Sequence, residues 1–211
     1  MKVKKMQIET KRLLLREMNQ QDFSALFNIF SHPETMKHYP APFDKKRVKD
    51  WIEWNIQNYR NYGFGLWSVV LKETGQVIGD CGITIQNING DLLPEIGYHV
   101  HKNYWKRGYG SEAAKAVRDY AFQNTDYEIL YSYVKYTNLA SASTAQKIGM
   151  KRSMNFLIRK IKFLMFMPLL EVNGSTTKNC LLGQPKSTLI PLIRKSPQPA
   201  NQNWIRVHYF L

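Results

Sequence analysis

Cysteine is scarce in this sequence, with only Cys81 and Cys180 among its 211 residues. Two cysteines so far apart provide neither a disulfide framework nor the spacing of a metal site, so we expect neither. Cys81 lies in an apolar segment, where burial as a small apolar side chain is the usual role of a free thiol. This scarcity fits a reducing compartment, and we expect the protein to be cytoplasmic.

Long hydrophobic runs are also missing. No apolar run is long enough to cross a bilayer, and no apolar segment follows the basic residues 1–5 as it would in a secretory signal. We therefore do not expect membrane binding. Hydrophobic residues nevertheless make up 44% of the chain, which is enough to build a buried core. The length is typical of one substantial domain with an extension.

Acidic residues are few, 16 against 30 lysines and arginines, and the formal net charge is +14. Such an excess indicates anionic partners, which include a phosphorylated cofactor, RNA or an acidic protein, and it does not choose among them. The imbalance is greatest after residue 152, where Glu171 is the only acid. The charge composition of the chain therefore changes near residue 152.

Hydrophobic periodicity and capping residues predict an alternating order of strands and helices. Asn19 and Asp44 are predicted to cap two helices, and Gly149 to end a third. The expected order is β-α-α-β-β-β-α-β-α, which predicts a mixed α/β fold with an antiparallel first part and a later β-α-β crossover. The strands are expected at 8–17, 63–72, 76–86, 95–100 and 129–135, and the helices at 20–30, 44–59, 108–124 and 138–148.

The stretch from residue 95 to 115 organises this pattern. Residues 95–100 alternate as a strand, residues 105–110 form a basic turn, and a helix follows. Gly108 and Gly110 lack a Cβ, so their backbone N–H groups can approach a ligand closely. The first N–H groups of a helix have no partners inside the helix and favour anions. The stretch therefore predicts either a pyrophosphate cradle or a simple tight turn.

Several segments in order resemble a known family. They are IETKRLLLRE near the start, EIGYHV and WKRGYGSEA in the central stretch, and NLASASTAQKIGMKR about thirty residues later. Together they resemble the GNAT superfamily of N-acetyltransferases, and within it the ribosomal-protein N-terminal (alanine) acetyltransferases. The resemblance covers residues 6–152. It implies a mixed, mostly antiparallel sheet with helices on both faces, acetyl-CoA as co-substrate, and an amine acceptor.

The resemblance also implies the residues that bind the co-substrate. The strand before the turn would pair with the pantetheine arm, and the Asn of an Asn-x-x-Ser motif would lie near that arm. Lys106 stands where relatives often have glycine. The residues implied for the turn are Lys106, Arg107, Gly108, Tyr109, Gly110 and Ser111, and those implied for the pantetheine are Tyr98, His99, Val100 and Asn138.

Acetyl transfer to an amine needs a group that removes a proton from the ammonium. Glu95, at the start of the strand, is the candidate base, and its alternative role is that of an ordinary carboxylate at a strand end. Ser141 is the candidate acid for the leaving thiolate, and it could instead cap its helix or bind the cofactor. Many relatives carry a tyrosine at the position of Ala145, so the identity of the acid stays open. His99 and His101 are secondary candidates.

The acceptor is not defined by the sequence. A ribosomal or other protein N-terminus and a small-molecule amine both fit. Two other functions stay open: a non-catalytic acyl-CoA-binding protein on the same scaffold, and a basic module associated with RNA or the ribosome. We do not expect nucleic acid to be the main partner, and both a monomer and a homodimer are compatible with the sequence.

The end of the chain departs from the family pattern. We expect an acetyltransferase domain at 1–155 and an atypical, loosely packed tail at 156–211, with the closing C-terminal hairpin absent or abnormal. Residues 156–171 can be written in codons whose shifted frame reads FDKKNKVFDVYAITR, a charged turn followed by an alternating strand. We therefore hypothesise that the tail results from a shifted reading frame, which sequencing the gene across these codons would test.

Overall fold

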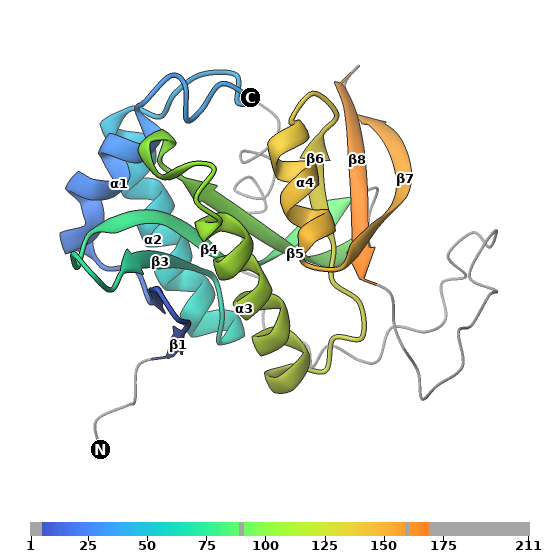
Figure 1. The fold of residues 1–211 in the computed structure, drawn as a ribbon, viewed down its shortest axis with the longest axis horizontal. Helices are drawn as coiled ribbons and strands as arrows, with labels where there is room; N and C mark the ends of the chain where they lie inside the picture. Colours follow the sequence, from blue (N-terminus) through green and yellow to red (C-terminus); the bar gives the residue numbers. More distant parts are fainter. Residues whose placement is uncertain (1–5, 89–90, 159–160, 169–211) are drawn as a thin grey trace. The chain divides into compact units, whose positions relative to one another are not determined.

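The computed structural model describes residues 6–88, 91–158 and 161–168, which form two sheets (Figure 1). The strand orders are β1-β2-β3-β4-β5 and β6-β8-β7. The elements in chain order are β1 (Gln7–Glu9), β2 (Leu13–Arg16), α1 (Phe23–Phe30), α2 (Lys45–Tyr62), β3 (Leu66–Leu71), β4 (Val77–Ile88), β5 (Asp91–Val100), α3 (Tyr109–Asn124), β6 (Ser132–Lys135), α4 (Leu139–Lys147), β7 (Met150–Ile158) and β8 (Ile161–Pro168).

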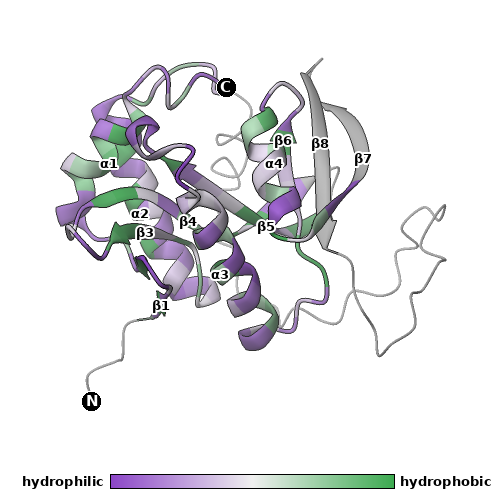
Figure 2. Cartoon of the chain, in the orientation of Figure 1, coloured by the Kyte–Doolittle hydropathy of each residue, from purple (hydrophilic) through white to green (hydrophobic). Residues whose placement is uncertain are grey.

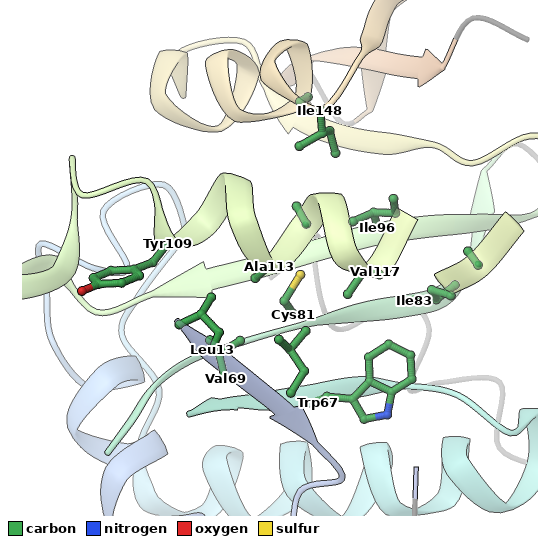
Figure 3. Packing of buried hydrophobic residues seen from close by; sticks show 14 of the residues in the cluster. Leu13, Trp67, Val69, Cys81, Ile83, Ile96, Tyr109, Ala113, Val117 and Ile148 are labelled. Atoms are coloured by element: carbon green, nitrogen blue, oxygen red, sulfur yellow. The ribbon is translucent and has the colours of Figure 1, made fainter. Parts of the chain in front are cut away.

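The five-stranded sheet is covered on both faces, as expected from the sequence. One core joins α3 and α4 to β2, β3, β4 and β5, and a second joins α1 and α2 to the other face. Figure 3 shows Leu13, Cys81 and Val117 within the first core. Figure 2 shows hydrophobic residues along β3 and hydrophilic residues along much of α3. Cys81 is fully buried, in agreement with the role expected for it.

The predicted helix ends are confirmed. The side chain of Asn19 accepts a hydrogen bond from Gln21 N–H, and that of Asp44 accepts one from Arg47 N–H. Gly149 has φ +84°, the left-handed conformation of a residue that ends a helix. The helix predicted at 20–30 begins with a short 3₁₀ turn at Gln20–Asp22 before α1.

The single strand expected at 8–17 is in fact two strands. β1 and β2 pair with each other in antiparallel fashion around a turn at residues 10–12. The hydroxyl of Thr10 accepts a hydrogen bond from Leu13 N–H at 2.9 Å, which closes that turn. A side-chain bond of this kind is not visible in hydrophobic periodicity, so the sequence pattern suggested a continuous strand.

The C-terminal hairpin was expected to be absent or abnormal, and its absence is contradicted by the structure. β7 pairs with β8 from Met150↔Pro168 to Ile158↔Ile161, and β8 also pairs with β6. A strand pairs through its backbone, so a run without apolar–polar alternation can still join a sheet. β7 continues through the boundary predicted at residue 155, and the contacts of this unit extend to Pro168. The other residues of the predicted tail, 159–160 and 169–211, lie outside the described part of the chain.

Among the helices in the described ranges, none has both the length and the apolar character that crossing a membrane requires.

Candidate active site

The predicted β-α-β crossover is present, and its two strands separate soon after they meet. β5 and β6 share one parallel bridge, Glu95↔Tyr131. There Ile96 N–H donates to Tyr131 O at 2.7 Å, and Tyr131 N–H donates to Pro94 O at 2.9 Å. Beyond this point β5 stays with β4 as far as Val100, whereas β6 pairs with β8. A wedge therefore opens between β5 and β6.

The edge of β5 that faces this wedge carries the backbone groups of every second residue. Ile96 N–H points toward β6, whereas His101 N–H donates to Ile78 O on β4. Alternation along a strand then directs the backbone groups of Tyr98 and Val100 toward the wedge. Val100 O accepts from Trp105 Nε1 at 2.6 Å. This edge can pair with the amide groups of an extended ligand.

The glycine turn leads directly into α3. Gly108 has φ +82° and precedes the first helical residue, Tyr109. The first intrahelical bond of this region runs from Glu112 N–H to Gly108 O, so the preceding N–H groups at the helix start point out of it. A Cβ on Gly110 would meet only Val100 Cγ2, at 3.7 Å. The turn therefore has backbone donors that point out of the helix, a geometry that can hold an anion.

Arg12, in the turn just before β2, joins the glycine turn to the start of α3. Its Nε donates to Glu112 Oε2 at 2.7 Å, and its Nη1 donates to Arg107 O at 3.0 Å. Thr10 Oγ1 also donates to Glu112 Oε1, at 2.6 Å. Burial acts to raise the pKa of Glu112, but the hydrogen bonds from Thr10 and Arg12 outweigh it and lower that pKa. The Glu112 carboxylate at the start of α3 is thus held by Arg12 and Thr10.

Lys106 has a left-handed backbone, with φ 60°. This conformation costs an L-residue about 1–2 kcal/mol, and more for a β-branched one. It explains why a glycine suits this position. We expect Lys106→Val to lower the free energy of unfolding by about 1–2 kcal/mol relative to Lys106→Gly. Both changes remove the same charge, so urea unfolding of the two variants isolates the backbone effect. Equal stabilities would contradict it.

Ser141 and Tyr98 meet beside the wedge, at the start of α4. The Tyr98 hydroxyl donates to Ser141 O at 2.8 Å, and Ser141 Oγ donates to the Tyr98 oxygen at 3.1 Å. Asn138, in the predicted Asn-x-x-Ser motif, accepts from Ser141 N–H at 3.1 Å. Burial is the main cause that raises the pKa of Tyr98. The two hydroxyls form one donor chain, which the sequence did not indicate for Tyr98.

Glu95 lies at the point where the strands separate, and only 1% of it is exposed. Its Oε1 accepts from Tyr133 N–H at 3.2 Å, across to β6. In a continuous parallel ladder a backbone carbonyl of β5 would accept that bond. The carboxylate therefore takes the place of a backbone group and helps to hold the wedge open.

His99 points to the face of the sheet opposite Tyr98. Its Nδ1 lies 2.7 Å from Asp80 Oδ1, and its Nε2 lies 2.5 Å from the Tyr39 hydroxyl. Trp51 Nε1 donates to Asp80 Oδ2 at 2.9 Å. Asp80 is fully buried. The backbone of His99 pairs with β4, so this residue does not share the ligand-facing edge with Tyr98 and Val100.

The other predicted site residues occupy the turn. Lys106 and Arg107 are exposed, and Arg107 stacks over the Tyr104 ring. The Tyr109 side chain is buried in the core, so its backbone is the part that faces the turn. His101 accepts from Asn103 N–H within the connection to the turn, away from the Tyr39–His99–Asp80 chain.

Comparison with known proteins agrees with this geometry. The sequence model described as "Acetyltransferase (GNAT) domain" matches residues 12–151. The Bacillus subtilis (strain 168) protein YkkB, which is uncharacterised, is 37% identical over 150 residues, covering 71% of this chain and 87% of YkkB. An acetyltransferase structure from Agrobacterium tumefaciens has a TM-score of 0.67 and 28% identity, covering 77% of this chain and 93% of the other. The chain therefore belongs to the GNAT family of acetyltransferases.

The family defines the class of reaction. GNAT proteins are acetyl-CoA-dependent N-acetyltransferases, and this chain is one of them. RimL, the ribosomal L7/L12 alpha-N-protein acetyltransferase, has been solved with coenzyme A; its TM-score is 0.64 at 15% identity, covering 77% of this chain and 97% of RimL. The open edge of β5 and the donors of the glycine turn fit such a ligand. Because Gly108 and Gly110 have no side chains, the backbone N–H groups of the turn stay accessible to such a ligand.

Proposed function

We propose that this chain transfers the acetyl group of acetyl-CoA to a primary amine by direct attack, with both substrates bound together. The observation that carries this proposal is the wedge between β5 and β6, with an anion cradle near one end and the Tyr98–Ser141 hydroxyl pair at its side. Acetyl-CoA supplies an activated thioester. The protein's part is to position that thioester, to remove a proton from the amine and to return one to the sulfur.

Each proposed site residue has a task in this scheme. The backbone of Tyr98 and Val100 would pair with the pantetheine arm, with Asn138 beside it, and the turn from Lys106 to Ser111 would hold the pyrophosphate. Ser141, acting alone or with Tyr98, would protonate the leaving sulfur. The negative charge of Glu95 contributes to raising the pKa of Tyr39. Glu95 remains the base candidate derived from the sequence.

The acceptor is proposed as either a protein N-terminus or a small-molecule amine. RimL acts on a ribosomal protein according to its name, but its likeness to this chain concerns the fold alone. A peptide with a free N-terminal alanine and a polyamine are therefore the first two acceptors to assay, by release of the free thiol of coenzyme A. Thiol release that depends on neither amine would count against this proposal.

Gly110→Glu tests the cradle itself. The new carboxylate would project from the helix start toward the bound pyrophosphate, so we expect acetyl-CoA to bind at least about tenfold more weakly, a loss of about 1.4 kcal/mol or more. Calorimetric titration with acetyl-CoA measures the change.

Gly110→Ala is the matched control, since its Cβ would meet only Val100 Cγ2 at an ordinary 3.7 Å. It should bind acetyl-CoA nearly as well as the original chain. Undiminished binding by a Gly110→Glu variant that melts normally would show that the pyrophosphate lies elsewhere.

A further inference from the structure

Tyr39, His99 and Asp80 form a chain of hydrogen bonds whose direction can be assigned. The indole Nε1–H of Trp51 can only donate, so Asp80 Oδ2 accepts. The other oxygen of this buried carboxylate accepts from His99 Nδ1–H. In the neutral ring, His99 Nε2 then keeps its lone pair and accepts from the Tyr39 hydroxyl. A histidine oriented in this way by a carboxylate can take up a proton at Nε2.

Exposure increases along this chain from inside to outside. Asp80 is fully buried, 11% of the His99 side chain is exposed, and Tyr39 is partly exposed. Tyr39 is therefore the outermost residue of this chain of hydrogen bonds. Phe30 and Trp51 contact the His99 ring edge-on and keep it in place.

We propose that Tyr39 accepts a proton from the acceptor ammonium while it passes its own proton to His99 Nε2. This inference rests on the proposed function and assigns the role of first proton acceptor to Tyr39 in place of Glu95, whose Oε1 accepts from Tyr133 N–H. One N–H bond of the ammonium breaks and a Tyr39 O–H bond forms, while the former Tyr39 O–H bond is replaced by an N–H bond on His99. The nitrogen keeps the electron pair that attacks the acetyl carbon. Asp80 balances the charge of the imidazolium, and the proton later returns to solvent through Tyr39.

The charges around Tyr39 favour a neutral hydroxyl that relays a proton over a tyrosinate anion that is already present in the resting protein. Burial first, and then the negative charges of Asp80 and Glu95, raise the pKa of Tyr39 far above its usual value, while Arg47 opposes them. The hydroxyl therefore stays protonated at rest and must release one proton as it receives another. These groups come from the loop before α2, from α2, from β4 and from β5, which together surround the hydroxyl.

The relay and the Tyr98–Ser141 pair lie on opposite faces of β5. His99 faces α1 and α2, whereas Tyr98 bonds to Ser141 at the start of α4. The amine proton would thus leave on the helix α2 side, and the thiolate would be protonated on the α4 side.

Two acceptors of different basicity test the relay. A peptide with an N-terminal alanine is largely protonated near pH 7, whereas hydroxylamine is largely unprotonated and needs no base. We expect Tyr39→Phe and His99→Gln to slow transfer to the peptide by about a hundredfold, and to hydroxylamine by no more than about threefold. Equal losses with the two acceptors would overturn the relay. Tyr39→Phe keeps the ring that contacts Phe43, so its melting temperature should stay close to that of the original chain.

The tautomer of His99 gives a second readout that needs no acceptor. Nitrogen NMR of the ¹⁵N-histidine-labelled protein, assigned with His99→Gln, should show that the neutral His99 ring carries its proton on Nδ1 and none on Nε2. A proton on Nε2 would overturn the relay, because that nitrogen could not receive one from Tyr39. If the original chain acetylates neither acceptor, the proposed amine transfer fails, and the tautomer still decides whether the relay is built as inferred.

Discussion

Replacing Gly82 with alanine is expected to destroy most of the stability of this protein. An added Cβ would lie 1.9 Å from Gly65 O and 2.6 Å from Leu66 Cα. Both are backbone atoms, and Leu66 is paired with Gly82 in the β3–β4 ladder, so neither can move without breaking the sheet. We expect a loss of about 4 kcal/mol or more, out of a total that is about 5–15 kcal/mol for most domains. Urea unfolding followed by circular dichroism measures it.

Gly97→Ala is the matched control for this change. Gly97 lies directly opposite Gly82 in the β4–β5 ladder, so the strand context is the same. Its Cβ would lie 3.4 Å from Leu66 Cδ2, the end of a side chain that can turn away. We expect a cost of about 1 kcal/mol or less. Similar losses for the two variants would show that the close approach of Gly65 to Gly82 does not determine the result.

Asp22→Ala should have the second largest effect, a loss of about 3–5 kcal/mol. Only 4% of Asp22 is exposed. Its carboxylate accepts from both Nη atoms of Arg16, at 2.6 and 2.8 Å, from Ser68 Oγ at 2.9 Å and from Asn19 N–H at 3.0 Å. Removal of the carboxylate would leave the guanidinium of Arg16 without its ion pair, and its cost is therefore greater than that of the lost bonds. Thermal and urea unfolding would measure it.

The Asp22 carboxylate also makes the free energy of unfolding depend on pH, and the direction of that dependence can be stated. Burial acts to raise the pKa of Asp22, but the hydrogen bonds from Arg16, Asn19 and Ser68 and the charge of Arg16 outweigh it and lower that pKa. The stability it contributes is therefore complete above the pKa of the unfolded chain, about 3.9, and is lost as the pH falls through the lower folded value. The stability difference between the original chain and Asp22→Asn should be constant above about pH 5 and shrink below about pH 4. A difference unchanged down to pH 2 would contradict this assignment.

Helix ends and turns could be predicted from the sequence wherever a single residue determines the local backbone conformation. Asn19 and Asp44 cap helices because their side chains reach N–H groups two or three residues ahead. The turn at Gly108 was recognisable because a strand, glycines and a helix start follow in order. The hairpin of β7 and β8 was missed, since its pairing depends on backbone contacts with β6 that no alternation records.

The relay shows what a single sequence leaves hidden. Tyr39, Asp80 and His99 lie in a loop and in two strands, with no common spacing, and only His99 stood out as a secondary candidate. Trp51 was readable as part of a helical stripe, but the hydrogen bond from its indole to Asp80 was not. Polar groups that meet only through the packing of α2 on the sheet leave no local pattern. The β-α-β crossover that contains the wedge, in contrast, followed from the order of elements.

Because the open edge of β5 is covered when acetyl-CoA binds, the solubility of the protein should depend on the concentration of acetyl-CoA. An unpaired strand edge is a template for pairing with another chain and hence for aggregation. A ligand that occupies this edge covers the template and stabilises the fold by mass action, by about 2.7 kcal/mol when its concentration is a hundredfold above its dissociation constant. Acetyl-CoA would then protect the enzyme as well as serve as its substrate, and a cell depleted of acetyl-CoA would hold less of the folded protein.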